Sequence, residues 1–551
     1  MIALKLRSRE LVEMGDKLFS QRTAAVSLWQ EIADNFYPER ADFTVSRSLG
    51  TEFASNLMSG APVLARRDLA NQFAAMLRPK GKEWFSLAPK DAKLAERRNV
   101  VAFSEWSTSV MRRAMYDSAA KFARATKEGD NDFAAFGQAV LSVELDPETM
   151  KLLYRCWHLR DVVWAENERG DIYQIHRKWK LSARDLCAKY KEKVPSKYHE
   201  LAKKEPFKEI ECRHVIVLYD QYDYNPKVKP VRAERFGFMS MLVLKEDDVL
   251  LNETPVIDHP YIIPRWQTVS GSQYAHSPCT VIALPDARLL QRITFTLLEA
   301  GEKATNPPMI AIQEAIRSDV AIYAGGITWA DAEYDERLGE VLRPLTMDHS
   351  GLKFGWEMGQ KHEEMVRKAF FLDQINLPAY DGAAMTATEI RVRTEEYVRA
   401  ALPLFEPMEA EYNGALCEKT FNLLNQHGGF GSPRDWPQEL VGAELDWQFS
   451  SPLSEAAQKQ KAFGFQEAAN LLAVAAQIDP ALRSEWDVRT DFRDALRSVK
   501  AAVVDEEVSD AALADAKQKE QLQEVIGLTQ NGAVAAEQLG KAAKSFQGIA
   551  A

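Results

Sequence analysis

Two glycine–lysine pairs are the first residues to test for nucleotide chemistry. A phosphate-binding loop requires the pattern G-x-x-x-x-G-K-[ST], in which backbone amides and a lysine surround the triphosphate. The segments Gly81-Lys82-Glu83 and Gly540-Lys541-Ala542 lack both the hydroxyl residue and the preceding glycine spacing. The sequence therefore predicts that this chain does not drive a process by hydrolysing ATP.

Two cysteine–histidine pairs are the next candidates, in this case for a metal. Cys156-Trp157-His158 and Cys212-Arg213-His214 place the two side chains closer in sequence than the usual C-x₂₋₄-C or H-x₃₋₅-H spacing of zinc sites. The chain also lacks the HExxH zinc motif and the G-x-S-x-G nucleophile elbow. Carboxylate pairs such as Glu363-Glu364 are typical of solvated helix faces. We therefore expect no enzyme, no metal and no cofactor.

Length and composition set the scale of the protein. A chain of 551 residues is too long for one compact core, so we expect two to four sub-structures. The longest apolar runs, Gly237–Leu244 and Ala468–Ile478, are much shorter than the roughly 18 to 20 residues that span a bilayer. Met1–Arg7 is charged at once and carries no apolar signal core. We expect a cytoplasmic protein that contacts no membrane.

Charge and cysteine content narrow the class further. A formal net charge of −11 does not suit a protein that grips nucleic acid over a large face, because such binding requires neutralised phosphates. Any contact with DNA is therefore expected to be loose or limited to a few local basic groups. The five scattered cysteines are odd in number, which predicts reduced, mostly buried thiols instead of disulfides.

The first half of the chain changes from helical to β patterning. Apolar residues at spacings of three and four predict helices over Leu4–Glu39, Leu64–Leu77 and Val101–Thr126. Short apolar segments between turn signals predict strands from Ala139 to Leu250, with a hairpin turn at Glu168–Asp171. The Pro- and Gly-rich segment Asn252–Ser277 is expected to be an ordered loop or linker.

The second half is mainly helical, so the predicted fold class is α+β, mainly α-helical. A helix is expected from Pro285 to Gly301, ended by Asn306–Pro308. A small mixed module with a thin core follows at Met309–Arg343. The remaining expected elements are a helix over Trp356–Ile375, a Pro/Gly loop over Asn376–Met385, a long helix over Thr386–Asn425, and helical patterning in the last hundred residues. The long helix starts with a capping box and is interrupted at Pro403 and Pro407.

Six groups of segments, in this order along the chain, resemble one known family. They are Trp29–Ala33 with Tyr37–Phe43; Leu69–Phe73 with Arg78-Pro79 and Trp84–Leu87; Asp132–Gly137; Tyr274–Pro278 with Ala283–Asp286 and Asn306–Pro308; Met385–Ile390 with Arg393 and Glu396; and Ser451–Ser454. Together they are similar to the portal, or head-to-tail connector, family of short-tailed bacteriophages (podoviruses). Ala275 departs from the family, in which a glycine is expected at this place.

The resemblance implies the phage portal fold, and its parts can be placed on this sequence. The implied parts are a wing of N-terminal helices plus a β-containing part (1–280), stem helix 1 (281–304), a small α/β clip (305–350), stem helix 2 (351–375), a channel or tunnel loop (376–385), a long wing helix and return (386–450), and a helical crown with a C-terminal tail (451–551).

The resemblance also implies function and partners. The chain would form a homo-oligomeric ring, expected to be a dodecamer, at the portal vertex of the virion capsid after assembly in the bacterial host cytoplasm. The ring would serve genome packaging, retention and ejection. Its implied partners are double-stranded viral DNA in the channel, the terminase, the major capsid and scaffolding proteins, the tail adaptor and internal core proteins.

Three groups of residues are candidates for these roles. The implied DNA-facing loop comprises Asn376, Leu377, Pro378, Ala379, Tyr380, Asp381, Gly382, Ala383, Ala384 and Met385; a plain surface connector is the alternative. Candidate channel or interface charges on the stem helices are Arg288, Arg292, Lys303, Lys361, Arg367 and Lys368, for which ordinary solvated or salt-bridged residues are an equal alternative. Arg391 and Arg393 are candidates to line the channel or to pair with neighbouring subunits, and the pairing is the favoured interpretation. Candidate clip contacts are Ile310, Ile312, Ile316 and Val320.

Two other functions stay open at this point. The chain could be another phage structural ring protein of the tail, such as an adaptor or tube component, although adaptors are much shorter and lack the helix–clip–helix–loop–long-helix order. It could also be an α+β enzyme, against which the absence of any catalytic constellation weighs.

Overall fold

A computed structural model describes residues 7–48, 50–54, 57–95, 97–146, 148–222, 237–311, 342–344, 351–372, 408–432, 436–440 and 442–450, together with residues 316, 329, 465, 468 and 469. The chain divides into two compact units, Met1–Ser454 and Glu455–Ala551. Only three of the described residues fall in the second unit, so the fold below is that of the first.

The N-terminal helical prediction is confirmed for the described residues, with one break. Helices α1 (Ser8–Gln21) and α2 (Thr23–Phe36) are separated at Arg22, and a 3₁₀ turn, Pro38–Arg40, follows. The buried Arg22 guanidinium donates to the backbone carbonyls of Leu159 and Val162 at 2.9 and 2.6 Å. The break therefore coincides with a contact between the helices and the β-containing part.

The next helices are α3 (Ala61–Leu77), the short α4 (Ala92–Ala95), α5 (Arg98–Met115) and α6 (Phe122–Phe136). The expected single helix over Val101–Thr126 is wrong, because the chain leaves the helical path between α5 and α6. Asp117 accepts a hydrogen bond from the Ala119 N–H at 2.9 Å, and Lys121 has φ +55°. A short polar side chain that bonds nearby backbone in this way competes with helix formation.

The main sheet is antiparallel and has the strand order β4-β5-β6-β7-β8. Its strands are β4 (Val162–Glu166), β5 (Ile172–Ser182), β6 (Glu209–Leu218), β7 (Phe238–Leu244) and β8 (Val249–Val256). The predicted turn between β4 and β5 is confirmed, with Gly170 at φ +84°. Two helices missed by the sequence analysis, α7 (Ala183–Tyr190) and α8 (Ser196–Lys204), lie between β5 and β6.

Two smaller sheets complete the β-containing part. One has the order β3 (Leu152–Trp157), β2 (Val140–Leu145), β9 (Tyr261–Ile262), and the other pairs β1 (Phe85–Pro89) with β12 (Leu445–Phe449). The expected loop over Asn252–Ser277 is therefore partly wrong, since β8 runs into it and β9 lies within it. The β1–β12 pair joins segments from opposite ends of the first unit.

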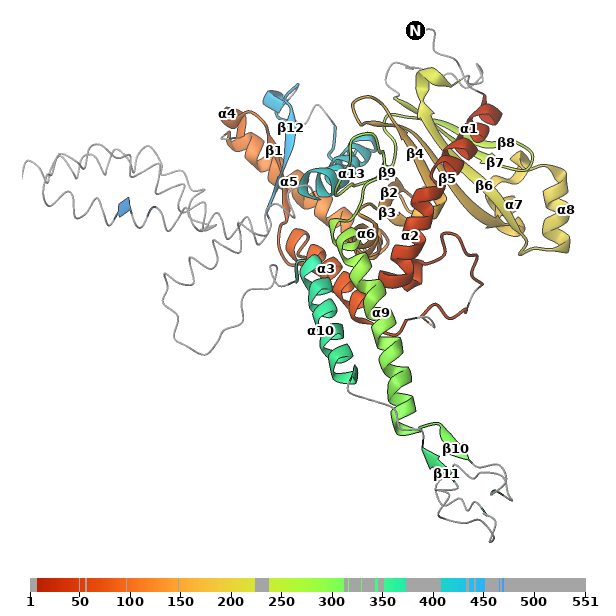
Figure 1. The fold of residues 1–551 in the computed structure, drawn as a ribbon. Coiled ribbons are helices and arrows are strands. Elements are labelled where there is room, and N and C mark those ends of the chain that lie inside the picture. Colours follow the sequence, from red (N-terminus) through yellow and green to blue (C-terminus); the bar gives the residue numbers. More distant parts are fainter. Residues whose placement is uncertain are drawn as a thin grey trace, which may run out of the picture. The chain divides into compact units, whose positions relative to one another are not determined.

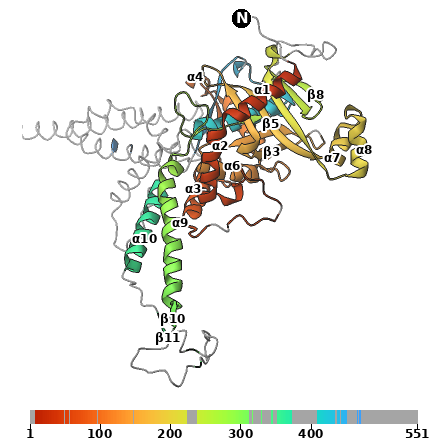
Figure 2. The same cartoon turned by 45° about the vertical axis from the view of Figure 1, so that its right-hand side comes forward.

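Two long helices project from this body, and a small hairpin lies beyond the far end of the first (Figures 1 and 2). They are α9 (Pro278–Thr305) and α10 (Gly351–Ala369), and between them β10 (Met309–Ala311) pairs with β11 (Leu342–Pro344). The expected start of the first helix at Pro285 is wrong. Ser277 caps the helix by accepting the Thr280 N–H at 3.5 Å, and Pro278 takes the first helical position.

Pro285 instead lies inside α9. Proline there removes the N–H that would bond the carbonyl of Val281. Val281 is exposed, so water can satisfy that carbonyl. The expected helix over Trp356–Ile375 also shifts: α10 begins five residues earlier, and the chain turns after Ala369, with Phe371 at φ +55°.

The expected long helix over Thr386–Asn425 is described only from Met408. This part is helical, with a π-helical turn at Glu409–Gly414 followed by α13 (Ala415–Gln426). The wider π-helical turn carries two buried residues, Tyr412 and Asn413. Turns of this kind are uncommon and are found where a helix must present particular side chains.

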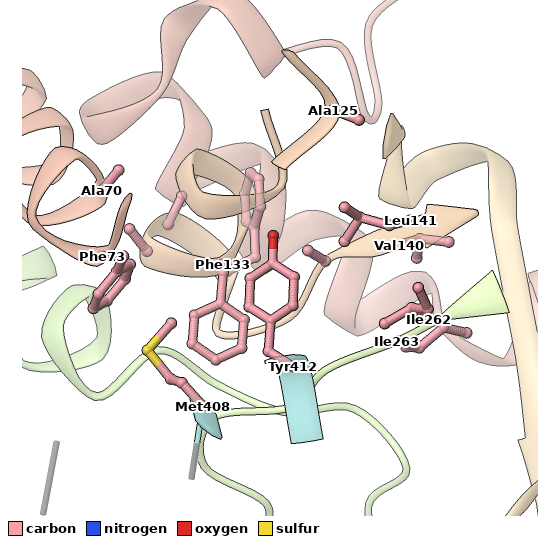
Figure 3. Close-up of a cluster of buried hydrophobic side chains, with 14 of the residues drawn as sticks. Ala70, Phe73, Ala125, Phe133, Val140, Leu141, Ile262, Ile263, Met408 and Tyr412 are labelled. Atoms are coloured by element: carbon pink, nitrogen blue, oxygen red, sulfur yellow. The ribbon is translucent and has the colours of Figure 1, made fainter. Parts of the chain in front are cut away.

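The hydrophobic core lies where these segments meet (Figure 3). Phe133 of α6 packs against Phe73 of α3, with ring centroids 6.0 Å apart, and against Tyr412, at 5.8 Å. Its ring stacks on Trp266 at 5.3 Å. Residues more than 330 positions apart in sequence thus share one core.

A buried ion pair sits beside these rings. Arg78, which follows α3, contacts the Asp130 carboxylate of α6, and its guanidinium also donates to Asn413 Oδ1 at 2.7 Å. The same guanidinium lies over the Tyr412 ring, 4.6 Å from its centroid. Burial is the largest single influence and lowers the pKa of Arg78, but the charge and hydrogen bond of Asp130 together with Tyr412 raise it, so that the net shift of the pKa is upward. We call these four residues the buried arginine network.

Gly137 ends α6 at a point of close backbone contact. Its φ is +70°, and an ideal Cβ there would lie 2.1 Å from the carbonyl carbon of His276. Only glycine fits such a position, since any Cβ would meet backbone that cannot move away. The close contact fixes α6 against the segment that leads into α9.

We predict that Gly137→Ala lowers the free energy of unfolding by about 3 kcal/mol or more, through clash and backbone strain together. Urea denaturation of the purified chain measures the loss. The matched control is Gly170→Ala, where φ is +84° but nothing lies within 4 Å of the added Cβ, so a loss of only about 1 kcal/mol is expected. Equal losses for the two variants would contradict the close contact at Gly137.

We predict that Asp130→Leu is destabilising by about 3 to 5 kcal/mol, because the buried Arg78 charge loses its counterion. Adding Arg78→Met to that variant should restore part of the loss by removing the uncompensated charge. Urea midpoints of the two single variants and the double variant form the required cycle. A double variant no more stable than Asp130→Leu alone would rule out the buried pair as the source of the effect.

Candidate functional site

Helices α9 and α10 form an antiparallel pair. His362 Nδ1 lies 2.9 Å from Asp286 Oδ1, while Gly359 faces Ile293 and Gly355 faces Leu297. Along these contacts the residue numbers increase on α9 and decrease on α10, so the two helices run antiparallel. Both views draw the helices side by side (Figures 1 and 2). An ideal Cβ on Gly355 would lie 2.9 Å from Leu297 Cδ2, so glycine permits the close approach.

The outer faces of this pair expose large apolar side chains to solvent. Phe295 of α9 is 52% exposed, and Phe354 and Trp356 of α10 are 66% and 63% exposed. The other exposed apolar residues of the two helices are Val281, Ile282, Leu289, Leu298 and Met365. Large apolar side chains gathered on exposed helix faces are typical of surfaces that another molecule covers.

The exposed residues of α10 lie on two different sides. Phe354 and Met365 are 11 residues apart, about three helical turns, so they share one side. Trp356 follows Phe354 by two residues, about 200° around the helix, and lies on the other side. The pair therefore offers two distinct apolar surfaces, one on each side of the contact with α9.

Three of the candidate charges are paired within the chain. Arg288 Nη2 lies 2.5 Å from Glu31 Oε1 of α2. Lys303 and Lys368 form helix pairs with Glu299 and Glu364 at 2.7 and 2.8 Å. For these three residues the structure supplies the ordinary salt-bridge role.

Three other candidate charges remain available. Arg292, Lys361 and Arg367 are exposed, and none has an acidic partner in the described parts of the chain. Arg288, Arg292 and Phe295 recur at spacings of four and three, so they share one face of α9. Arg292 therefore combines an unpaired charge with the exposed apolar surface.

The other candidates are less fully described. Ile310 lies in β10, is 40% exposed and pairs in register with Arg343, and Ile316 is half-buried. The whole loop Asn376–Met385, Arg391, Arg393, Ile312 and Val320 lie outside the described residues. Their roles stay predictions.

Segments that carry the family resemblance meet in the core. Arg40 holds the Asp132 carboxylate through Nε and Nη2, both at 3.1 Å. Phe43 packs edge-on against Phe136 at 5.2 Å. The Ser277 hydroxyl donates to the Ala134 carbonyl at 2.8 Å. Three of the sequence markers thus touch one another through α6, which makes them packing residues and not exposed contact residues.

The first and fourth markers also touch. Trp29 of α2 packs edge-on against Tyr274 at 5.4 Å. Ala275, which replaces the expected glycine, is buried, and its N–H donates to Gln138 Oε1 at 3.0 Å. Sequence reasoning identified the marker segments but missed Asp130, which pairs with Arg78, and Tyr412, which packs against Phe133. The sequence offers no spacing signal for these two residues.

The two cysteine–histidine pairs are engaged within the protein. Cys156 Sγ donates to Asp132 Oδ2 at 3.6 Å, and His158 Nε2 lies 2.6 Å from Asp42 Oδ1. His214 sits between the Tyr261 hydroxyl at 2.6 Å and Ser240 at 2.9 Å, and burial followed by the Arg177 charge lowers its pKa. None of the five cysteines forms a disulfide in the structure, and three of them are buried.

The described residues offer neither a metal-binding cluster nor a membrane-spanning helix. Within the described ranges, no group of three or more His, Cys, Asp or Glu side chains is arranged to hold a metal ion. Among those same residues, no helix has the length and apolarity needed to cross a bilayer.

Comparison with known proteins gives three similarities. The chain is 23% identical over 481 residues to the "Probable portal protein" of Bordetella phage BPP-1, covering 87% of this chain and 84% of that protein. It is 21% identical over 486 residues to the "Portal protein" of Salmonella phage epsilon15, covering 86% and 84%. A solved structure titled "Neck of empty GTA particle computed with C6 symmetry" aligns with a TM-score of 0.36 and 10% identity, covering 75% of this chain and 89% of that one.

The family comparison spans nearly the whole sequence. Residues 8–505 match the family described as "Bacteriophage head to tail connecting protein". This range takes in all six groups of resembling segments and the α+β body with its projecting helix pair. The chain belongs to the bacteriophage head-to-tail connecting protein family.

Proposed function

We propose that this chain assembles into a ring-shaped channel at one capsid vertex, through which the viral genome is packaged, retained and ejected. Family membership and two relatives named as portal proteins support the proposal. The expected ring is a dodecamer. It docks the terminase during packaging and the tail adaptor afterwards.

The exposed apolar surface of α9 and α10 is the observation that carries the proposal. A closed ring uses heterologous contacts, in which each subunit offers two different surfaces to its two neighbours. Phe354 and Trp356 supply apolar surfaces on opposite sides of α10. Burying each large side chain against a neighbouring copy contributes about 1.5 to 3 kcal/mol, which favours assembly.

The parts of the portal fold are assigned to the following residue ranges and elements. Residues 1–280 form the wing, α9 and α10 form the stem, and β10 with β11 forms the base of the clip. Neighbouring subunits would stabilise the clip, whose short sequence predicts only a small core of its own. Residues 376–385 form the channel loop, 386–450 the long wing helix and return, and 451–551 the crown and tail.

The mechanism requires no bond-making step by this chain. The terminase supplies the force, and double-stranded DNA slides through the ring. An acidic chain suits sliding, because a wall that neutralised many phosphates would hold the DNA in place. Among the candidate charges, Arg292, Lys361 and Arg367 are exposed and free to meet DNA or a neighbouring subunit.

We predict that the purified chain forms discrete rings with a central hole in negative-stain microscopy, and that Phe354→Ser combined with Trp356→Ser yields monomers. Both substitutions remove apolar area that assembly buries. The control is Val269→Ser, an exposed apolar residue outside the stem, which should leave the rings intact. Monodisperse wild-type monomers at high concentration would count against the ring, and intact rings in the stem variant would exclude this interface.

We predict that deleting Pro378–Ala383 spares ring assembly but impairs packaging or genome retention, because the loop constricts the channel. Complementation of a phage lacking the gene, followed by measurement of packaged DNA per particle, tests this. Replacing the six residues by a Gly/Ser segment of equal length serves as the length control. Normal packaging and retention in the deletion variant would refute the role of the loop.

A further inference from the structure

The helical hairpin between β5 and β6 carries a charge opposite to that of the whole chain. Residues 183–208, which include α7 and α8, contain eight Lys and Arg against four Asp and Glu, a net +4. The rest of the chain then carries −15, given the overall charge of −11. The hairpin is therefore a local basic surface on an acidic protein.

Most of these basic side chains are free of acidic partners. Lys197 pairs with Asp247 at 2.6 Å and Lys208 with Glu205 at 3.6 Å. The other six are exposed and have no acidic partner among the residues that the structure describes. These six, Arg184, Lys189, Lys191, Lys193, Lys203 and Lys204, form what we call the basic hairpin surface. Two acidic residues of the hairpin, Glu192 and Glu200, are also without a basic partner there.

The six residues lie at the two ends of the hairpin. The Ala183 N–H donates to the Lys208 carbonyl at 2.9 Å and the Arg184 N–H to the Pro206 carbonyl at 3.1 Å. These bonds place Arg184 beside the end of α8, near Lys203 and Lys204. The second group, Lys189 to Lys193, lies at the far end of α7, about 12 Å away along eight residues. This separation is similar to the width of the DNA major groove, about 12 Å.

Helix stabilisation accounts for only part of this charge. Lys189, Lys203 and Lys204 lie in the last turns of α7 and α8, where positive charge favours the helix dipole. Arg184 lies in the first turn of α7, where the dipole disfavours a cation. Lys191 and Lys193 lie beyond the end of α7. Local helix energetics therefore do not explain half of the set.

The composition favours nucleic acid over protein as the partner. Lysine is depleted at protein–protein interfaces, which are built on aromatic and apolar anchors. The large apolar residues of the hairpin, Leu186 and Tyr198, are buried, and Phe207 alone is prominently exposed at its edge. Lysines on flexible stems without a fixed geometry are suited to the evenly spaced phosphates of DNA.

We propose that the basic hairpin surface binds the phosphate backbone of duplex DNA outside the channel, without sequence preference. Figures 1 and 2 draw α7 and α8 on the side of the main sheet away from α9, so this contact is separate from the stem. The proposal goes beyond the channel function and does not depend on it. Ring formation and DNA binding by the hairpin are measured separately, so failure of the channel proposal can be told apart from failure of the hairpin proposal.

The test uses the full chain and a covalently closed DNA minicircle labelled with a fluorophore. A closed circle cannot thread through a preassembled ring, so its binding reports on outer surfaces only. The test variant replaces Lys191, Lys193, Lys203 and Lys204 by Gln. The control variant makes the same charge change at four exposed lysines elsewhere, Lys17, Lys80, Lys93 and Lys127. Fluorescence anisotropy is recorded between 50 and 200 mM salt.

We expect the test variant to bind the minicircle at least about tenfold more weakly at 50 mM salt, with a salt slope smaller by about three to four. The control variant should bind like the wild type. Equal weakening in both variants would show a general charge effect and overturn the proposal. Unchanged minicircle binding in the test variant would also overturn the proposal. If that variant at the same time lost binding to a poly-glutamate peptide, the surface would be assigned to an acidic protein.

Discussion

The buried contact between Arg78 and Asp130 is the constraint on which the rest of the described fold depends. It joins the end of α3 to the middle of α6, and Asn413 brings in a segment more than 330 residues further along the chain. Moving two charges out of water costs several kcal/mol per ion, which the direct contact and further hydrogen bonds such as that to Asn413 must offset. Two residues further along α6, Asp132 holds Arg40 in a second, bidentate pair. Helix α6 is thus held by two ion pairs and by the aromatic core around Phe133.

The position of the stem follows from that of α6. Gly137 at the end of α6 meets the backbone of His276, and the hydroxyls of Ser277 and Thr280 donate to carbonyls of α6 at 2.8 Å each. The buried residues of α9 all lie between Cys279 and Leu290, and those of α10 are Val366 and Ala369 near its end. The half of the stem next to the core is therefore anchored within the chain. The other half keeps its apolar residues exposed, which is the arrangement expected of an element completed by neighbouring copies.

The sequence predicted the order of the elements better than their limits. Periodicity located α1, α2, α3 and the stem helices because each carries apolar residues at helical spacing. It failed between α5 and α6, where the Asp117 side chain bonds local backbone, and at Pro285, which a helix tolerates once Ser277 has capped it earlier. It missed α7 and α8, which are short and sit inside a β-rich stretch. The ion pairs of Arg40 and Arg78 were beyond prediction, because their partners lie 92 and 52 residues away and no local pattern marks them.

Charge placement connects the two proposals. A channel must let DNA pass, so its wall has to present few unpaired cations, and three of the six described stem candidates are neutralised by carboxylates of the same chain. Holding DNA near the ring requires unpaired cations, because binding depends on neutralising the DNA phosphates. One chain can meet both requirements if its densest group of free cations lies away from the stem. The basic hairpin surface meets this condition, because Arg184 to Lys204 extend from a sheet whose strands contribute nothing to the α9–α10 pair.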